Sequence, residues 1–137
     1  MPKLDDVKGK LLFVLDAGEN INSLYVRDHP SLSGRVMFIN ANEGTPEAAF
    51  MILNNPFISF TKIQEFVKKG YMVRTRSDAN TIEARNNDYS RWLKALESGA
   101  QVITTDYYRP SNLFESHYLV GFKADTVFKI NPIRIKK

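Results

Sequence analysis

Four short, continuous apolar runs constrain the fold of this 137-residue chain more than any other feature. They lie within residues 8–16, 34–41, 70–76 and 100–107. Each run is too short for a helix and too uniformly apolar for a strand with one face in water. Strands of this kind are buried on both faces, which is typical of a parallel sheet covered by helices.

Segments with helical start and stop signals separate these strands. The expected helices span residues 45–55, 61–70 and 80–99, and a shorter helix of one or two turns is expected within residues 20–32, ended by Pro30. Thr45 followed by Pro46 suits a helix start, because proline has no N–H to leave unpaired in the first turn. Pairs at positions 61 and 64 and at positions 80 and 83 predict capping boxes. Gly70 and Gly99 are placed as helix stops.

The alternation of strand and helix predicts an α/β fold with right-handed βαβ crossovers. Two architectures fit four such units: a small doubly wound sheet, or half of a TIM-type (β/α)8 barrel. Residues 109–137 follow as a short C-terminal extension. Their alternation of apolar and polar residues predicts either a terminal strand pair or an ordered segment packed on the sheet.

Composition limits the classes of partner. The formal net charge is +4, which favours anionic partners such as phosphates or acidic lipid surfaces. The basic residues are scattered, and there is no basic face with aromatic platforms, so we expect no nucleic-acid binding. The sequence has no cysteine, which excludes disulfides, thiol nucleophiles and thiolate metal sites. No apolar run reaches the length of a membrane span, and the N-terminal residues lack a signal-peptide pattern.

Polar residues follow the predicted strands. In parallel α/β sheets and barrels, ligands meet the carboxyl ends of the strands, whichever architecture applies. The strand-end residues therefore form the candidate site: Asp16, Asn40, Arg74, Arg76 and Asp106.

Arg74 and Arg76 are the most informative members of this set. Two residues apart on a strand, they point to the same face. Paired guanidinium groups suit a phosphate or carboxylate, which arginine can bind in a bidentate manner. An ion-pair cluster with Asp78, Asp106 or Glu83 is the alternative, and the spacing does not decide between the two.

The remaining titratable residues carry weaker signals. Asp16 and Asp106 could orient a substrate hydroxyl, bind a metal or act as a base, and equally could cap a helix or pair with an arginine. His29 and His117 lie away from the strand ends, so we expect surface or packing roles for them. No zinc-ligand spacing, nucleophile motif or glycine-rich phosphate loop is present.

Longer blocks of the sequence resemble one family. The segments KGKLLFVLD, HPSLSGRVMFINA, PEAAFMILNNP, GYMVRTRSDANTIEARNND and LESGAQVITTDYY are similar, in this order, to the calcium-dependent phosphoinositide phospholipase C family of bacteria and fungi. The resemblance covers about residues 4–108, and the closing INP also fits. It implies a TIM-type (β/α)8 barrel that hydrolyses a phosphodiester of a phosphoinositide lipid. The chain matches the C-terminal half of that barrel, as a fragment or single partial domain over 1–137.

The resemblance also implies which functions this chain lacks. The family's catalytic histidine pair and calcium-binding acids belong to the first half of the barrel, and His29 and His117 do not match them. Calcium is thus expected as cofactor of the full-length family, with none bound by this chain alone. Family members are usually secreted.

What carries over is the substrate side of the barrel. The resemblance places Arg74 and Arg76 at the phosphate or inositol head group, with Asp78, Asp16, Asn40 and Asp106 as further substrate-side residues. The expected partners are a phosphoinositide or other phosphodiester and a membrane surface. The alternative function is a non-catalytic half-barrel that homodimerises and binds anionic, phosphate-containing ligands.

Overall fold

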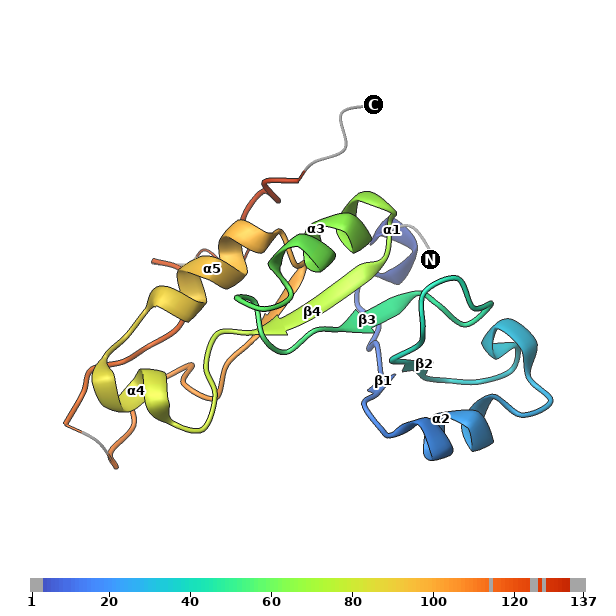
Figure 1. Ribbon diagram of the computed structural model, residues 1–137, viewed down its shortest axis with the longest axis horizontal. Helices are drawn as coiled ribbons and strands as arrows, with labels where there is room; N and C mark the ends of the chain where they lie inside the picture. The colour runs from blue at the N-terminus through green and yellow to red at the C-terminus, as the bar shows by residue number, and fades with distance from the viewer. Residues whose placement is uncertain (1–3, 114, 124–125, 127, 134–137) are drawn as a thin grey trace. The chain divides into compact units, whose positions relative to one another are not determined.

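The computed structural model divides into two compact units, residues 1–52 and residues 53–137 (Figure 1). It describes residues 4–113, 115–123, 126 and 128–133. The expectation of a single domain over the whole chain stays a prediction. Across the described residues, no helix is long and apolar enough to cross a membrane.

The first unit contains short elements around a small parallel sheet. Its elements are α1 (Leu4–Val7), β1 (Val14–Leu15), α2 (Glu19–Val26), the 3-10 turn η1 (Pro30–Leu32), β2 (Phe38–Ile39) and β3 (Phe50–Ile52). Strands β1 and β2 are parallel, with Val14 opposite Phe38 and Leu15 opposite Ile39. The expected helix over 20–32 is confirmed in its first part as α2, which ends at Val26.

The expected helix over 45–55 is wrong, because residues 50–52 form strand β3. The run from Phe50 to Ile52 is apolar and short, as in the other strands, and that pattern outweighs the Thr45–Pro46 start signal. Asn40 supplies the pairing. It forms a parallel bridge with Phe50, and its side-chain Oδ1 accepts a hydrogen bond from the Ile52 N–H at 2.9 Å.

The second unit contains three helices and two strands among its described residues. Its elements are α3 (Phe60–Lys68), β4 (Met72–Arg76), α4 (Ile82–Asn86), α5 (Ser90–Ser98) and β5 (Val102–Thr104). Strands β4 and β5 run parallel, with Arg74 opposite Val102 and Arg76 opposite Thr104. Helices α3 and α5 pack on each other and on β4 (Figure 1).

The core of the second unit lies between these helices and one face of β4. Val73 is fully buried, and so is Ile63 of α3. Phe66 and Val67 of α3 and Ala95 of α5 are also buried. Because side chains alternate along a strand, Arg74 and Arg76 lie on the opposite face of β4 from Val73. The packing of the helices therefore determines which face carries the arginines.

Helix boundaries differ from the sequence expectation at two caps. Helix α3 begins after Ser59 without a side-chain cap, so the predicted capping box at 61 and 64 is wrong. The helix expected over 80–99 is split into α4 and α5. Asn80 and Thr81 have positive φ, which removes Asn80 from the extended geometry of an N-cap. Glu83 instead accepts the Ala79 N–H at 2.8 Å.

The described residues of the C-terminal extension form no strand. Tyr118 is 1% exposed and Val120 is also buried, together with Ala84 and Tyr107. The Val120 N–H donates to the Tyr107 carbonyl at 2.9 Å. These residues pack on α4 and on the segment after β5, and the predicted packing on the sheet stays a prediction.

These elements give a mixed α/β fold whose strands pair in parallel, which is compatible with a partial βα barrel. The predicted parallel pairing is confirmed. The predicted burial on both faces is wrong, because β4 alternates between half-buried and buried residues and neither residue of β1 is fully buried. Because β3 replaces an expected helix, the count of four βα units in half a barrel stays a prediction.

Gly99 offers a test of how the C-terminal extension packs. It ends α5 with φ +75°, and a Cβ there would lie 2.5 Å from the Ile133 side chain and 3.0 Å from that of Asn131. Gly70 also has positive φ but has open space around its Cα. We expect Gly70→Ala to cost about 1 kcal/mol from backbone strain and Gly99→Ala clearly more. Urea unfolding measures both, and equal losses would show that residues 131–133 do not pack on Gly99.

Candidate anion-binding site

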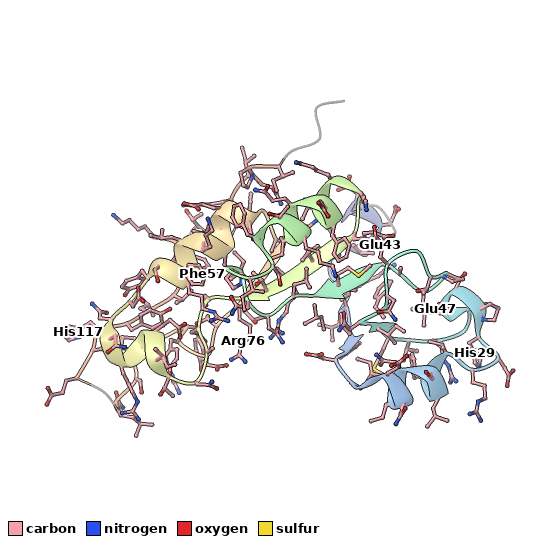
Figure 2. All side chains as sticks on the ribbon, viewed as in Figure 1. His29, Glu43, Glu47, Phe57, Arg76 and His117 are labelled. Carbon is pink, nitrogen blue, oxygen red and sulfur yellow. The ribbon has the colours of Figure 1, made fainter. Side chains whose placement is uncertain are left out.

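Arg74 and Arg76 lie on one face of β4, as their spacing predicts. Both are partly exposed, whereas Val73 and Thr75 on the other face are buried. Figure 2 shows Arg76 at the end of β4. The strand thus places Arg74 at its middle and Arg76 at its carboxyl end, both on the face away from the helices.

Arg76 is paired with the acid that follows the neighbouring strand. Its Nη2 donates to Asp106 Oδ2 at 3.0 Å. Arg76 lies opposite Thr104, and Asp106 follows two residues later on the same face. The Arg76 side chain is 31% exposed and that of Asp106 is 72% exposed. The ion pair proposed from the sequence is therefore present, in a position that solvent reaches.

Arg74 is held from the segment that precedes α3. Its Nη1 donates to Asn54 Oδ1 at 2.5 Å. The backbone beside it is also paired, because the Leu53 N–H donates to the Arg74 carbonyl at 2.9 Å. The backbone bond of Leu53 thus holds Asn54 beside β4, and the Asn54 side chain points at the Arg74 guanidinium group.

Asp78 is buried, with 1% of its surface exposed. Its Oδ2 accepts hydrogen bonds from Ser77 Oγ at 2.7 Å and from Thr105 Oγ1 at 2.6 Å. Its Oδ1 accepts the Asp106 N–H at 3.2 Å. A buried carboxylate needs such donors, because burial without them is costly. Asp78 therefore ties the end of β4 to the end of β5 and fixes the backbone of Asp106.

Two tyrosines pack under this joint. Tyr118 donates to the Ser77 carbonyl at 3.3 Å, and its ring lies edge-on to that of Tyr107. Burial, with the carboxylates of Asp78 and Glu83, raises the pKa of Tyr118 well above its ordinary range. Burial and Asp78 also raise the pKa of Tyr107. Both hydroxyls thus stay protonated beside the buried carboxylate.

Asp16 and Asn40 belong to the first unit. Asp16 follows β1 and is exposed. Asn40 follows β2, and its Oδ1 is engaged by the Ile52 N–H. Its carbonyl accepts Asn22 Nδ2 at 3.1 Å. Within its unit Asn40 therefore joins β2 to β3, and its role toward a substrate stays a prediction.

His29 belongs to the first unit and His117 to the second. His29 Nδ1 is 2.7 Å from the Ser33 carbonyl and, facing an acceptor, donates its proton. His117 is exposed, near α4 and away from Arg76 (Figure 2). Their expected surface and packing roles agree with these positions.

Two of the concave regions formed by described residues of the second unit bear on the site. One, of about 420 Å³, is lined largely by apolar side chains such as Trp92, Phe122 and Ile130. It lies toward the start of β5, whereas Arg76 faces the end of that strand. The other lies beside Asp106 and is lined by residues 106–112. Asp106, which pairs with Arg76, belongs to the lining of the second region, so this region adjoins the Arg76 pair.

Sequence reasoning missed several residues that shape the site. Asn54 precedes α3, and Arg91 lies on α5, where it pairs with Glu83 and with the Asn54 carbonyl. Thr105 holds Asp78. Thr105 lies between a predicted strand and Asp106, and this strand-end position is a signal that could have identified it. Arg91 gave no such signal, because one arginine in an amphipathic helix is usually solvated.

The model of one protein family, described as calcium-dependent phosphoinositide phospholipase C, matches residues 1–132. The chain belongs to this family. Comparison with curated proteins and with solved structures found no match. This match confirms the resemblance that the sequence blocks indicate. It covers residues of both units of this phospholipase C family member.

The family is calcium-dependent by its description, so the acids of the site can be tested as calcium ligands. Calcium takes six to eight oxygen ligands, several of them carboxylates. Throughout the described ranges, no three His, Cys, Asp or Glu side chains gather as metal ligands. Asp78 is occupied by its donors, and Asp106 faces a cation already. These residues do not fit a calcium site.

The raised pKa of Tyr118 predicts the alkaline stability of this phospholipase C family member. The unfolded chain ionises Tyr118 near its ordinary pKa of about 10, while the folded chain keeps the proton. The stabilising contribution is therefore complete below pH 10 and is lost as the pH rises above it. We expect Tyr118→Phe to lose less stability than wild type between pH 8 and pH 11 in urea unfolding. Tyr108→Phe, at an exposed tyrosine, should follow wild type.

Proposed function

We propose that this chain supplies the head-group side of a phosphoinositide phospholipase C, with Arg74 and Arg76 binding the phosphate or inositol group. The observation that carries the proposal is the pair of arginines on one face of β4, in its second half. Arginine presents a planar set of five N–H donors that matches phosphate oxygens. Family membership supports a phosphoinositide as the anion.

The Arg76–Asp106 pair is compatible with anion binding. Its one recorded contact joins Nη2 to Oδ2, and a guanidinium group carries four further N–H bonds. Asp106 is mostly exposed, so the surrounding water screens the attraction between the pair. Arg76 can therefore take a phosphate oxygen while Asp106 limits its direction. Asp106 itself could accept a hydroxyl of the inositol ring.

Hydrolysis of the phosphodiester needs groups that these residues do not supply. Guanidinium groups stabilise charge on a phosphate but stay protonated and do not transfer protons at neutral pH. We propose that the chain corresponds to the C-terminal half of the family's barrel. The acid–base histidines implied by the resemblance then act from residues other than His29 and His117.

Exposed apolar side chains support contact with a lipid surface. Phe57 and Ile58 lie in the segment before α3 that also holds Asn54. Ile82 follows β4, and Tyr108 follows β5. All four are at least half exposed, and each lies in a segment that begins at the arginine end of the sheet. Exposed aromatic and aliphatic groups beside cationic groups suit an anionic membrane surface.

Arginine substitutions test the head-group assignment. Arg74→Ala and Arg76→Ala should each weaken binding to phosphatidylcholine vesicles that contain phosphatidylinositol, roughly tenfold or more, because each loses charged hydrogen bonds. Vesicle co-sedimentation measures this change. Lys68→Gln, at the opposite end of β4, removes the same charge and should bind as wild type.

Soluble inositol 1-phosphate separates head-group recognition from general attraction to the membrane. It should compete with the vesicles for wild type and not for the arginine variants. Binding that is unchanged in both arginine variants would show that the arginines are structural, and the head-group proposal would be wrong.

The second candidate function is a non-catalytic half-barrel that homodimerises and binds anionic ligands. Exposed apolar side chains in the first unit favour it: Leu11, Leu12 and Phe13, which precede β1, are at least half exposed. Apolar residues of a buried-strand run need a cover, and a second copy would supply one. Light scattering across a concentration series should then show a dimer that Phe13→Lys disrupts. A monomer at all concentrations would exclude this candidate.

A further inference from the structure

Arg91 occupies an unusual position for a helix arginine. It lies on α5, and its side chain is only 12% exposed. Its Nη1 forms an ion pair with Glu83 Oε1 at 3.6 Å, and its Nη2 donates a hydrogen bond to the Asn54 carbonyl at 2.9 Å. The guanidinium group thus connects α4 to the segment before α3. An arginine is costly to bury, and two acceptors on different segments give that burial a defined geometry.

Asn54 carries the connection to the site. Its backbone carbonyl accepts from Arg91, and its side-chain Oδ1 accepts from Arg74 Nη1 at 2.5 Å. A guanidinium group has no acceptor, so the amide must turn its oxygen toward Arg74. The same residue is therefore held by one arginine through its backbone and holds another through its side chain.

We infer that Arg91 is a positioning residue, which orients Arg74 through Asn54. Glu83 completes the support, because its carboxylate pairs with Arg91 and accepts the Ala79 N–H at the start of the α4 turn. The chain of contacts runs from the buried Glu83 through Arg91 and Asn54 to the partly exposed Arg74. It joins α4, α5, the residues before α3 and β4. It fixes the direction of one of the two arginines at the candidate site.

Arg76 is oriented by a different set of residues. Its partner Asp106 is held through its backbone by Asp78, which is held in turn by Ser77 and Thr105. Within the described residues, the contacts named here for Arg74 and those named for Arg76 have no residue in common. Arg91 therefore acts on Arg74 selectively, which a general effect on folding would not do.

Lysine cannot replace Arg91 in this role. Its ammonium group is a compact point charge, whereas the guanidinium fork reaches two acceptors from fixed positions. In Arg91→Lys the charge beside Glu83 is kept, which avoids a buried carboxylate without a partner. The Asn54 carbonyl then loses its fixed donor. Asn54→Ala gives the complementary change, because Asn54 is exposed and its backbone carbonyl remains for Arg91.

The test measures the reactivity of individual arginines in the full chain without any ligand. Phenylglyoxal modification followed by peptide mapping gives a separate rate for Arg74 and Arg76. We expect Arg91→Lys and Asn54→Ala each to raise the rate at Arg74 severalfold and to leave Arg76 at the wild-type rate. Lys94→Gln, on the same helix, is the control and should change neither. An unchanged rate at Arg74 in both variants, or equal increases at both arginines, would overturn the inference.

The consequence for ligand binding rests on the proposed function. Arg91→Lys should weaken binding of phosphatidylinositol vesicles severalfold, and the double variant with Arg74→Ala should bind like Arg74→Ala alone. Losses that add would show that Arg91 does not act through Arg74. If Arg74→Ala binds like wild type while the modification rates change as expected, the positioning of Arg74 holds and the head-group function is wrong.

Discussion

The buried carboxylate of Asp78 is the interaction on which the arrangement of the second unit's site depends. Parallel strands place residues side by side, but their ends are free to diverge once the ladder stops. Asp78 lies just beyond β4 and accepts hydrogen bonds from the residues that follow both strands. Ser77, after β4, donates one, and Thr105 and Asp106, after β5, donate the others. A carboxylate at 1% exposure is stable only with such donors, so the two strand ends are held together. Arg76 and Asp106 meet because of it.

The parallel strands could be predicted from the sequence because their signal is local. Short apolar runs predict strands, and β1, β2, β4 and β5 form where these runs lie. Burial on both faces does not follow from the same signal, because β4 alternates between half-buried and buried residues and β5 is half-buried throughout. The same signal was present in Phe50–Ile52, where it competed with a proline and a threonine typical of a helix start. The partner of that segment, Asn40, lies ten residues away, and a local pattern does not show such pairing.

The candidate site was predictable to the extent that it follows from strand alternation. Arg74 and Arg76 share a face because every second residue does, and Asp106 reaches Arg76 through the register of two parallel strands. The sequence left open whether the arginines bind an anion or close an ion pair, and the structure shows the Arg76–Asp106 pair. Asn54 and Arg91 were not predictable, because their contacts join segments 20 and 37 residues apart.

Burial separates the two kinds of ion pair around this site. The pair between Arg91 and Glu83 has side chains 12% and 9% exposed, so each charge depends on the other and the pair cannot be exchanged for water or ligand without large cost. The pair between Arg76 and Asp106 is open to solvent, where such a contact contributes only about 1 kcal/mol or less. A phosphate oxygen can compete at the second pair and not at the first. This difference supports the proposed anion binding at Arg76, because its acid partner does not have to be removed from a buried position.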